Sequence, residues 1–439
     1  MSEQAPPGPP EPPGSPGPAT ATKQEEKSGE SHRSFGQILR ESILEGNSVT
    51  VIFLAIFTAI VIGGLLNAFT NTTVLHAWGN FFSAPGAAIS QAWNTAIGAY
   101  VALFEGSIFN PHTVAALFQQ ASFSTAIHDG YLAAVFNPLS ETCVQATPLL
   151  LAGLAVALPY QAGMFNIGAQ SQFIGGAILA TYLGYGVSLP PVIHVIVCVL
   201  GGFVGGAVLG WVVGELKART GAHEVITTLM LNVIAPAIAL TVLRSGLVGG
   251  SPAPIPSVPR LFDLPTVRLD WGFVVALVMA AVVSFMLFRT TLGFELRATG
   301  LSRSVAGSAG MRPGASIMLA MAISGGLGGM ASAFITLGPG AGIGGGPLDL
   351  GFVALALALL GGLRPSGVVL AALFYGALSN GAKTMVIATG VPLALLVVII
   401  ATAMLFVAAP GLVRSIWRLP ADPGAWLDSP VVDRPGSPL

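Results

Sequence analysis

Long apolar runs, each close to the length needed to cross a lipid bilayer, constrain this chain more than any other feature of the sequence. A helix needs about 20 apolar residues to cross the hydrocarbon of a membrane. Hydrophobic residues make up 53% of the 439 residues and charged residues only 8%, too few to give a soluble fold of this size a polar surface. Because a helix satisfies its own backbone hydrogen bonds in lipid, the sequence predicts an all-α polytopic membrane protein.

Ten segments fit this pattern, so we expect about ten transmembrane helices. They are 49–67, 143–160, 163–183, 189–213, 225–245, 271–288, 314–337, 350–363, 366–382 and 389–409. The eighth and ninth segments are short and are joined tightly at Gly361 to Pro365. A helix that is broken or re-entrant needs fewer apolar residues than a complete span.

Lysine and arginine predict the orientation, because cytoplasmic loops carry an excess of both. Residues 1–40 hold four basic side chains, whereas residues 68–138 hold none, so we expect the first helix to run outward from the cytoplasm. The later basic residues expected on the cytoplasmic side are Lys217, Arg219, Arg289, Arg297, Arg303, Arg312, Arg364, Arg414 and Arg418. Those expected outside are Arg244, Arg260, Arg268 and Lys383. This balance predicts that both termini are cytoplasmic.

Composition divides the chain into three parts. Residues 1–34 are rich in proline, glycine, serine and glutamate and are predicted to form a disordered cytoplasmic tail. Residues 35–409 form the transmembrane domain, and 410–439 a cytoplasmic C-terminal tail. Within the domain, 68–138 is a long extracytoplasmic segment. Its apolar runs either lie on the membrane surface or pack into the bundle, and an additional pair of spans there is an alternative.

Uncharged polar residues inside the apolar segments are the candidates for a solute pathway, because such residues are costly in a membrane and usually face a partner or a path. They are Asn166, Gln170, Gln172 and Asn232. Asn166 and Gln170 are four residues apart, so we expect them to share one face of a helix. Amides both donate and accept hydrogen bonds, which suits a neutral polyol or a nucleobase. The alternative is interhelical hydrogen bonding with no ligand.

Small residues predict how the helices pack. Gly201, Gly205, Gly206 and Gly210 repeat the small-xxx-small spacing, which we expect to place them along one helical face and to let two membrane helices approach closely. The two cysteines, Cys143 and Cys198, lie in apolar stretches, so neither a disulfide nor a metal site is predicted. His223 and Glu224 could begin a zinc-protease motif, but that motif needs a second histidine at position 227, which is threonine here. Glu224 instead lies where an acidic residue complements a helix N-terminus.

The cytoplasmic segment 289–313 is predicted to form a helical elbow. Its sequence indicates a helix over 295–299, a break at Gly300, and a second helix over 302–309. Such an elbow suits the docking of another protein, and a solvated connector is the alternative. No Gly-rich phosphate loop with a following Lys-Ser or Lys-Thr occurs, so energy for any transport must come from a partner or from a gradient.

Four motifs together resemble one family. They are Phe165-Asn-Ile-Gly168 with the glutamine-rich turn after it, Glu224 to Asn232, Glu295-Leu-Arg-Ala-Thr-Gly300, and Gly361-Gly-Leu-Arg-Pro-Ser-Gly367. Over residues 139–409 the chain is similar to the permease subunits of ATP-binding-cassette importers of the branched-chain amino acid and simple sugar group, within the branch that takes up nucleosides. Two departures are Gln170-Ser171, where the family usually has Glu-Gly, and His223, where it has asparagine.

The resemblance implies a fold of two inverted halves and a pair of permease subunits, identical or homologous, in the plasma membrane of a prokaryote. The implied partners are an ATPase subunit, which carries ATP and Mg²⁺, and an extracytoplasmic solute-binding lipoprotein. Membrane lipid surrounds the chain, and neither a nucleic acid nor a cofactor of its own is expected. The implied coupling residues, which would contact the ATPase, are Glu295, Arg297, Ala298, Gly300 and Arg303.

The sequence leaves open an exporter or a structural membrane subunit, and three more specific functions. The first is a nucleoside permease subunit. The second is a permease for simple sugars of the ribose type or for branched-chain amino acids, which would differ in the receptor that delivers the solute. The third is a membrane-embedded enzyme, which needs ionisable residues clustered at one membrane depth. The sequence holds no such cluster.

Overall fold

The computed structural model describes residues 48–119, 130–246, 257–262, 267–338 and 350–419. The chain divides into two compact units, one of Val51–Val413 and one of Met1–Thr50 with Arg414–Leu439. Most of the second unit lies outside the described residues, and so does the whole N-terminal tail predicted at 1–34. The fold described below is that of the first unit, together with the helix ends that continue into the second.

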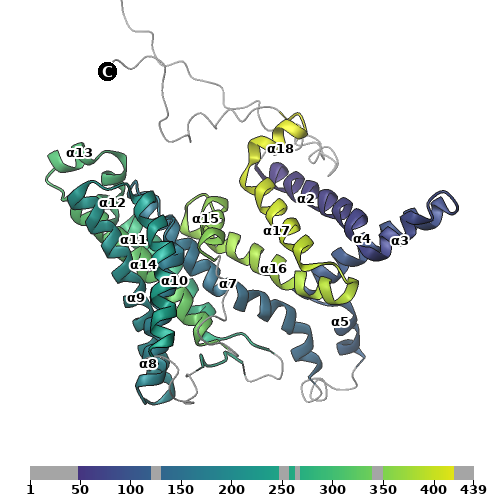
Figure 1. The fold of residues 1–439 in the computed structure, drawn as a ribbon, viewed down its shortest axis with the longest axis horizontal. Coiled ribbons are helices and arrows are strands. Elements are labelled where there is room, and N and C mark those ends of the chain that lie inside the picture. Colours follow the sequence, from purple (N-terminus) through teal and green to yellow (C-terminus); the bar gives the residue numbers. More distant parts are fainter. Residues whose placement is uncertain (1–47, 120–129, 247–256, 263–266, 339–349, 420–439) are drawn as a thin grey trace, which may run out of the picture. The chain divides into compact units, whose positions relative to one another are not determined.

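Every regular element in the described ranges is an α-helix, apart from one isolated bridge between Arg260 and Asp270. The helices, shown in Figure 1, are α2 (Ser48–Thr70), α3 (Thr72–Gly79), α4 (Pro85–Ser107), α5 (Pro111–Phe118), α7 (Tyr131–Gln161), α8 (Ala169–Gly186), α9 (Pro191–Thr220), α10 (Glu224–Arg244), α11 (Trp271–Arg289), α12 (Thr291–Leu301), α13 (Arg303–Ser308), α14 (Pro313–Thr336), α15 (Leu350–Leu360), α16 (Pro365–Thr389), α17 (Leu393–Ala408) and α18 (Pro410–Ile416). The predicted all-α class is confirmed.

Six helices in the described part of the chain are long and apolar enough to cross a membrane. They are α2, α7, α9, α10, α11 and α14, and the bent pair of α17 and α18 makes a seventh if it is one span. The other predicted spans correspond to α8, α15 and α16, and α15 has only 11 residues. The structure thus gives six or seven candidate spans, and the expected number of about ten stays a prediction.

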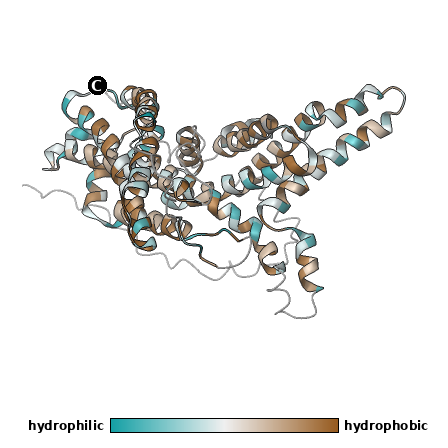
Figure 2. Cartoon of the chain, turned by 60° about the horizontal axis from the view of Figure 1, so that its bottom comes forward, coloured by the Kyte–Doolittle hydropathy of each residue, from teal (hydrophilic) through white to brown (hydrophobic). Residues whose placement is uncertain are grey.

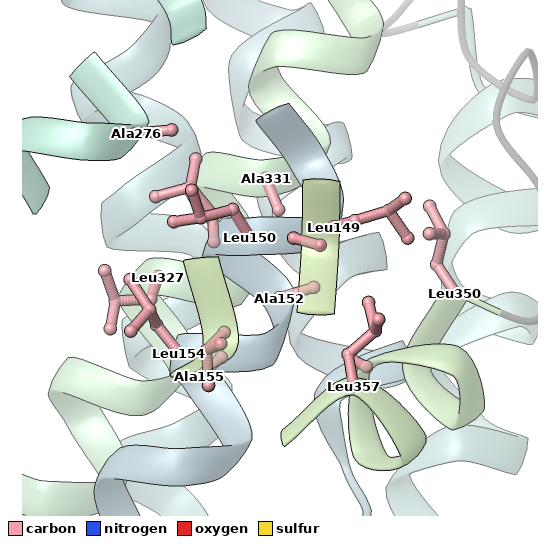
Figure 3. Close-up of a cluster of buried hydrophobic side chains, with 14 of the residues drawn as sticks. Leu149, Leu150, Ala152, Leu154, Ala155, Ala276, Leu327, Ala331, Leu350 and Leu357 are labelled. Carbon is pink, nitrogen blue, oxygen red and sulfur yellow. The ribbon is translucent and has the colours of Figure 1, made fainter. Parts of the chain in front are cut away.

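Helix α7 provides the centre of the hydrophobic core. From Leu149 to Leu158 every residue is buried, as expected for a helix that is apolar on all sides. It packs against α11, α14, α15 and α16. Figure 3 shows Leu150 and Leu154 of α7 close to Leu327 of α14, with Leu357 of α15 in the same cluster. Neighbouring helices therefore cover the central helix from several sides.

Helices α9 and α10 instead expose large apolar side chains along their length. On α9 these are Val192, Ile193, Ile196, Leu200, Val204, Val208 and Trp211. On α10 they include Ile226, Met230, Val233 and Ile234. Figure 2 shows hydrophobic residues distributed along the long helices. Apolar surface of this extent is costly in water, so these faces suit contact with lipid or with another membrane subunit.

Glycines bring α9 into backbone contact with two neighbours. A Cβ on Gly206 would collide with the carbonyl oxygen of Gly325 on α14, and one on Gly210 with that of Met321. A Cβ on Gly205 would instead collide with the carbonyl oxygen of Gly175 on α8, and one on Gly201 with the side chain of Leu183. The four predicted packing glycines thus lie on two faces of α9, rather than on the single face expected from their spacing.

The segment 68–138 holds α3, α4 and α5 and the first turns of α7. Its apolar run at 96–104 lies within α4, which packs closely against α16. The two helices approach at Gly106 and Gly381, because a Cβ on either would collide with the opposite helix. This part of the segment is therefore packed into the helical bundle.

Candidate functional site

The predicted amide cluster lies where the chain turns from α7 into α8. Asn166 is not helical, because α8 begins at Ala169. The expectation that Asn166 and Gln170 share a helical face is therefore wrong. The physical reason is local: the Asn166 Oδ1 accepts a hydrogen bond from the Gly168 N–H at 2.9 Å. Asparagine commonly makes this turn, in which its side chain replaces a backbone acceptor.

Asn166 and Gln172 are fully buried and bind each other. The Asn166 Nδ2 donates to the Gln172 Oε1 at 2.9 Å and to the Ser324 Oγ at 2.8 Å. The Ser324 hydroxyl in turn donates to the carbonyl of Ala155 on α7. One connected network therefore ties α8 to α7 and α14. Ser324 was not predicted, and its only signal in the sequence is a hydroxyl inside a glycine-rich apolar segment.

The other two candidates hold the start of α8 to different neighbours. The Asn232 Oδ1 on α10 accepts from the Ser171 N–H at 2.9 Å, and its Nδ2 donates to the Ile167 carbonyl at 3.0 Å. The Gln170 Oε1 accepts from the Gly351 N–H of α15 at 3.0 Å. The Gln170 amide nitrogen donates no hydrogen bond within the described residues. Of the four amides, Gln170 is the one whose nitrogen has no hydrogen-bond partner among the described residues.

The segment 289–313 forms a helical elbow, but its break differs from the prediction. Helix α12 continues through Gly300 to Leu301, and α13 begins after Ser302, whose Oγ accepts from the Val305 N–H at 3.4 Å. Glycine is required at 300 by close packing, since a Cβ there would lie 2.8 Å from the Gly163 nitrogen. The break predicted at Gly300 is therefore wrong, and the serine cap places it two residues later.

The side chains of the elbow divide into those that bind their own chain and those that face outward. The Arg297 Nε donates to the Gly293 carbonyl at 3.3 Å, and its guanidinium lies 5.3 Å from the centre of the Phe288 ring. Glu295 is exposed, and Ala298 is half-buried. Three large apolar side chains are also exposed, and the sequence reasoning missed them: Phe294, Leu301 and Val305.

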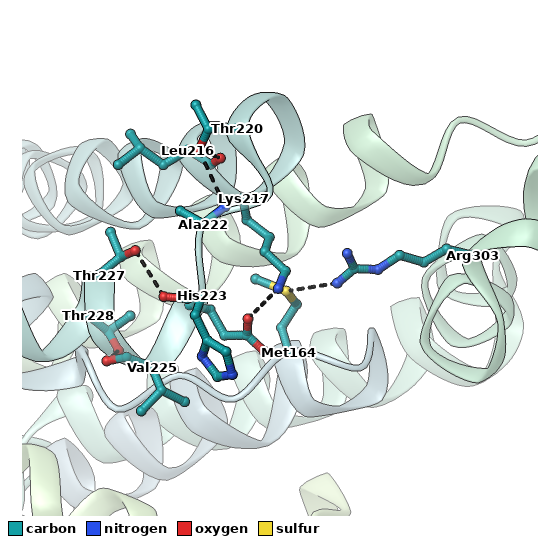
Figure 4. A network of polar contacts seen from close by, with 11 residues as sticks. Met164, Leu216, Lys217, Thr220, Ala222, His223, Val225, Thr227, Thr228 and Arg303 are labelled. Carbon is teal, nitrogen blue, oxygen red and sulfur yellow. Dashed lines mark hydrogen bonds and ion pairs between the residues drawn. The ribbon is translucent and has the colours of Figure 1, made fainter.

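An ion pair lies close to this elbow, as Figure 4 shows. The Lys217 Nζ at the end of α9 is 2.7 Å from the Glu224 Oε2 at the start of α10, with both side chains mostly buried. Beside it, the Arg303 Nη2 lies 3.7 Å from the Met164 Sδ. Glu224, which the sequence placed at a helix N-terminus, thus also joins two helices. The contact of Arg303 links α13 to the turn that precedes α8.

The chain matches known proteins over most of its length. Residues 139–409 match the family described as "Branched-chain amino acid transport system / permease component". The guanosine ABC transporter permease protein NupP of Bacillus subtilis is 35% identical over 311 residues, which cover 68% of this chain and 88% of that protein. The nucleoside ABC transporter permease protein NupB of Lactococcus lactis is 29% identical, over 62% of this chain and 79% of that protein.

A third relative is named for a different solute. The glucose ABC transporter permease protein TsgB13 of Haloferax volcanii is 32% identical, over 61% of this chain and 75% of that protein. No solved structure matches the chain.

Proposed function

Because this chain belongs to the family of branched-chain amino acid transport system permease components, we propose that it is the membrane-spanning subunit of an ATP-driven importer of nucleosides. It is a multi-pass membrane protein, and its family and relatives are transporter permease subunits rather than enzymes. The observation that carries the nucleoside proposal is the similarity to a guanosine permease over 88% of that protein's length.

The elbow of α12 and α13 supports the part of the proposal that concerns energy. An importer without its own nucleotide site needs a surface to which an ATPase can bind. The exposed Phe294, Leu301 and Val305 give the elbow three large apolar side chains that an ATPase subunit would cover. We assign the coupling role to this surface together with Glu295 and Arg303, while Arg297, Ala298 and Gly300 hold the elbow against its own chain.

The amide cluster supports a neutral polar solute. Gln170 is the amide whose nitrogen stays free to donate among the described residues, and we place it on the solute path. Asn166, Gln172 and Asn232 position the helix that carries it, through the hydrogen bonds given above. An uncharged solute with donors and acceptors suits such a group better than an ion does.

The assembly proposed around this chain follows its family, whose members work with ATPase and solute-binding partners. We propose about ten transmembrane helices in two inverted halves, with both termini in the cytoplasm. A second permease subunit, an ATPase that carries ATP and Mg²⁺, and an extracytoplasmic lipoprotein receptor complete the importer. Its location is the plasma membrane of a prokaryote.

The test is ATP-dependent uptake of labelled uridine, adenosine, ribose and leucine by cells with and without this gene. Uptake of the two nucleosides alone is the expected result. A gene-dependent uptake of ribose or leucine without nucleosides would overturn the substrate and keep the architecture. The alternative of a sugar permease is favoured by one observation, the 32% identity to a glucose permease, so glucose belongs in the same panel.

A further inference from the structure

A polar cavity lies away from the amide cluster, between α4, α5, α7 and α16. It has a volume of about 330 Å³, within the range of small-molecule sites. Its lining residues are Glu105, Gly106, Asn110, Thr113, Ala134, Asn137, Pro138, Asn380 and Thr384. We call it the outer pocket.

The outer pocket and the coupling elbow are far apart, as the lengths of α7 and α16 show. The Gln161 Nε2 at the end of α7 donates to the Leu363 carbonyl just before α16 at 3.1 Å, so these two ends share one side of the bundle. A Cβ on Gly300 of the elbow would touch the same turn. At 1.5 Å per residue, Pro138 and Thr384 lie roughly 30–35 Å along their helices from that side, about one bilayer thickness.

Glu105 is the unusual residue of this pocket. No lysine or arginine occurs between Arg40 and Lys217, and Glu105, Asp129 and Glu141 are the only acidic residues between Glu45 and Glu215. Glu141 pairs with Arg268 at 3.4 Å. The half-buried Glu105 has neither an ion pair nor a hydrogen bond to its side chain within the described part of the chain. A carboxylate without a protein partner in an apolar bundle is costly, and a ligand that donates several hydrogen bonds would reduce that cost.

Two other groups of the pocket are acceptors without a described partner, whereas the Asn110 amide nitrogen is a donor without one. The Asn380 Nδ2 donates to the carbonyls of Gly106 and Pro138 at 2.8 and 3.0 Å, which leaves its Oδ1 as the group without a described partner. Asn380 is only 8% exposed. The carbonyl of Ala134, another lining residue, lacks its usual helical donor, because the residue four positions on is Pro138, which has no N–H. The Thr384 hydroxyl is likewise unpaired among the described residues.

We propose that the outer pocket is the first binding site for a solute with a vicinal diol, the ribose of a ribonucleoside, and that Glu105 accepts hydrogen bonds from that diol. A pocket whose free groups are mainly acceptors selects a ligand with several O–H or N–H donors. Carboxylates bind ribose hydroxyls in this way in other folds. The inference rests on the proposed nucleoside function and adds a site, a recognised group and a preference for ribose over deoxyribose.

The experiment measures binding of labelled uridine and 2′-deoxyuridine to the purified permease–ATPase complex in lipid nanodiscs, without the solute receptor. In the wild type uridine should bind roughly 10- to 100-fold more tightly, the usual range for a hydrogen bond to a charged group. Glu105→Gln should weaken uridine binding by that factor and leave 2′-deoxyuridine almost unchanged, so that the two affinities become similar. Glu105→Asp, which keeps the carboxylate, should retain part of the preference and shows that the pocket is folded.

Glu141→Gln is the matched control. It removes a half-buried acidic residue that lies outside the pocket, and it should leave the ratio of the uridine and 2′-deoxyuridine affinities unchanged. The pocket assignment fails if Glu105→Gln lowers both affinities equally, or if wild-type binding requires Na⁺ or K⁺ when tested against a choline salt. A wild-type complex that takes up no nucleoside in cells overturns the proposed function itself. If the wild type takes up nucleosides but Glu105→Gln leaves the ratio of the uridine and 2′-deoxyuridine affinities unchanged, only the assignment of the outer pocket is overturned.

Discussion

Asn166 illustrates how a single buried polar side chain organises this chain. Its amide contacts Gln172 and the backbone of Gly168 nearby in the sequence, and Ser324, which lies 158 residues further along the chain, so it ties the start of α8 to α14. A buried polar group that loses its partner costs more than the hydrogen bond it had contributed. Residues that the sequence identifies as polar in an apolar segment can therefore be essential for stability without touching a solute.

Asn166→Ala is expected to lower the free energy of unfolding by about 3 kcal/mol, because it leaves the Gln172 Oε1 and the Gly168 N–H without their partner. The measurement is the thermal unfolding midpoint of the purified complex, with Gln119→Ala at an exposed position as the control. Gln170→Ala, which leaves only the Gly351 N–H without its partner, should lower the midpoint by less and should raise the KM for uptake. An unchanged midpoint for Asn166→Ala would argue against the structural role.

At the scale of helices, contact between backbones decides how this bundle packs. Glycines remove the side chains that would otherwise separate α9 from α14 and α8, and membrane helices gain their association energy from such close contact. The elbow uses the same device, since Gly300 of α12 lies against Gly163. Two elements with different tasks thus depend on small residues for the same steric reason.

Gly206→Leu is expected to destabilise the bundle by about 1–3 kcal/mol or more, because its side chain would collide with the carbonyl of Gly325. The readout is the fraction of protein that stays monodisperse in mild detergent on heating. Gly98→Leu in α4 is the matched control, since a Cβ there meets nothing within 4 Å. Equal effects of the two substitutions would contradict the packing described for α9.

The elbow offers a second prediction at this scale. Leu301→Ser should reduce the amount of ATPase that co-purifies with this chain, because an exposed apolar side chain that anchors an interface usually contributes more than 1 kcal/mol. Phe82→Ser, which also changes an exposed apolar residue but lies far from the elbow in the sequence, should leave co-purification unchanged. If the same amount of ATPase co-purifies with Leu301→Ser as with Phe82→Ser, the ATPase must dock elsewhere.

For the whole molecule, orientation in the membrane decides how the sites cooperate. Gly300 of the elbow packs against the end of α7, whereas the proposed outer pocket is lined by residues near the start of α7 and the end of α16. An importer needs such a separation, because solute arrives on one side of the membrane and ATP is hydrolysed on the other. The proposed topology assigns the elbow to the cytoplasm.

Ser304→Cys and Ser83→Cys test this topology in a background where Cys143 and Cys198 are replaced by serine. Both introduced cysteines occupy exposed positions. A membrane-impermeant maleimide should label Ser83→Cys in intact cells and Ser304→Cys only in inside-out vesicles, as the distribution of basic residues predicts. Labelling of Ser304→Cys in intact cells would reverse the orientation.

The sequence by itself determined the all-α membrane class, the six helices that coincide with candidate spans, the elbow and the family. These properties depend on local patterns: the length of an apolar run, the position of basic residues and a few short motifs. Such patterns can be interpreted without knowing which segments are neighbours in the fold. The same kind of signal made Asn166, Gln170, Gln172 and Asn232 candidates, because a polar residue in an apolar run is visible in the sequence alone.

Only the tertiary structure decided what those residues contact. The hydrogen bonds that each amide makes depend on partners such as Ser324 and Gly351, which are distant in sequence. Gly300 suggested a helix break, yet it serves a close approach to Gly163 that no local pattern reveals. The outer pocket likewise arises because α4, α7 and α16 meet around Glu105 and Asn380. Hydrogen bonds and steric contacts between distant segments follow from packing, and for that reason the sequence pattern left them open.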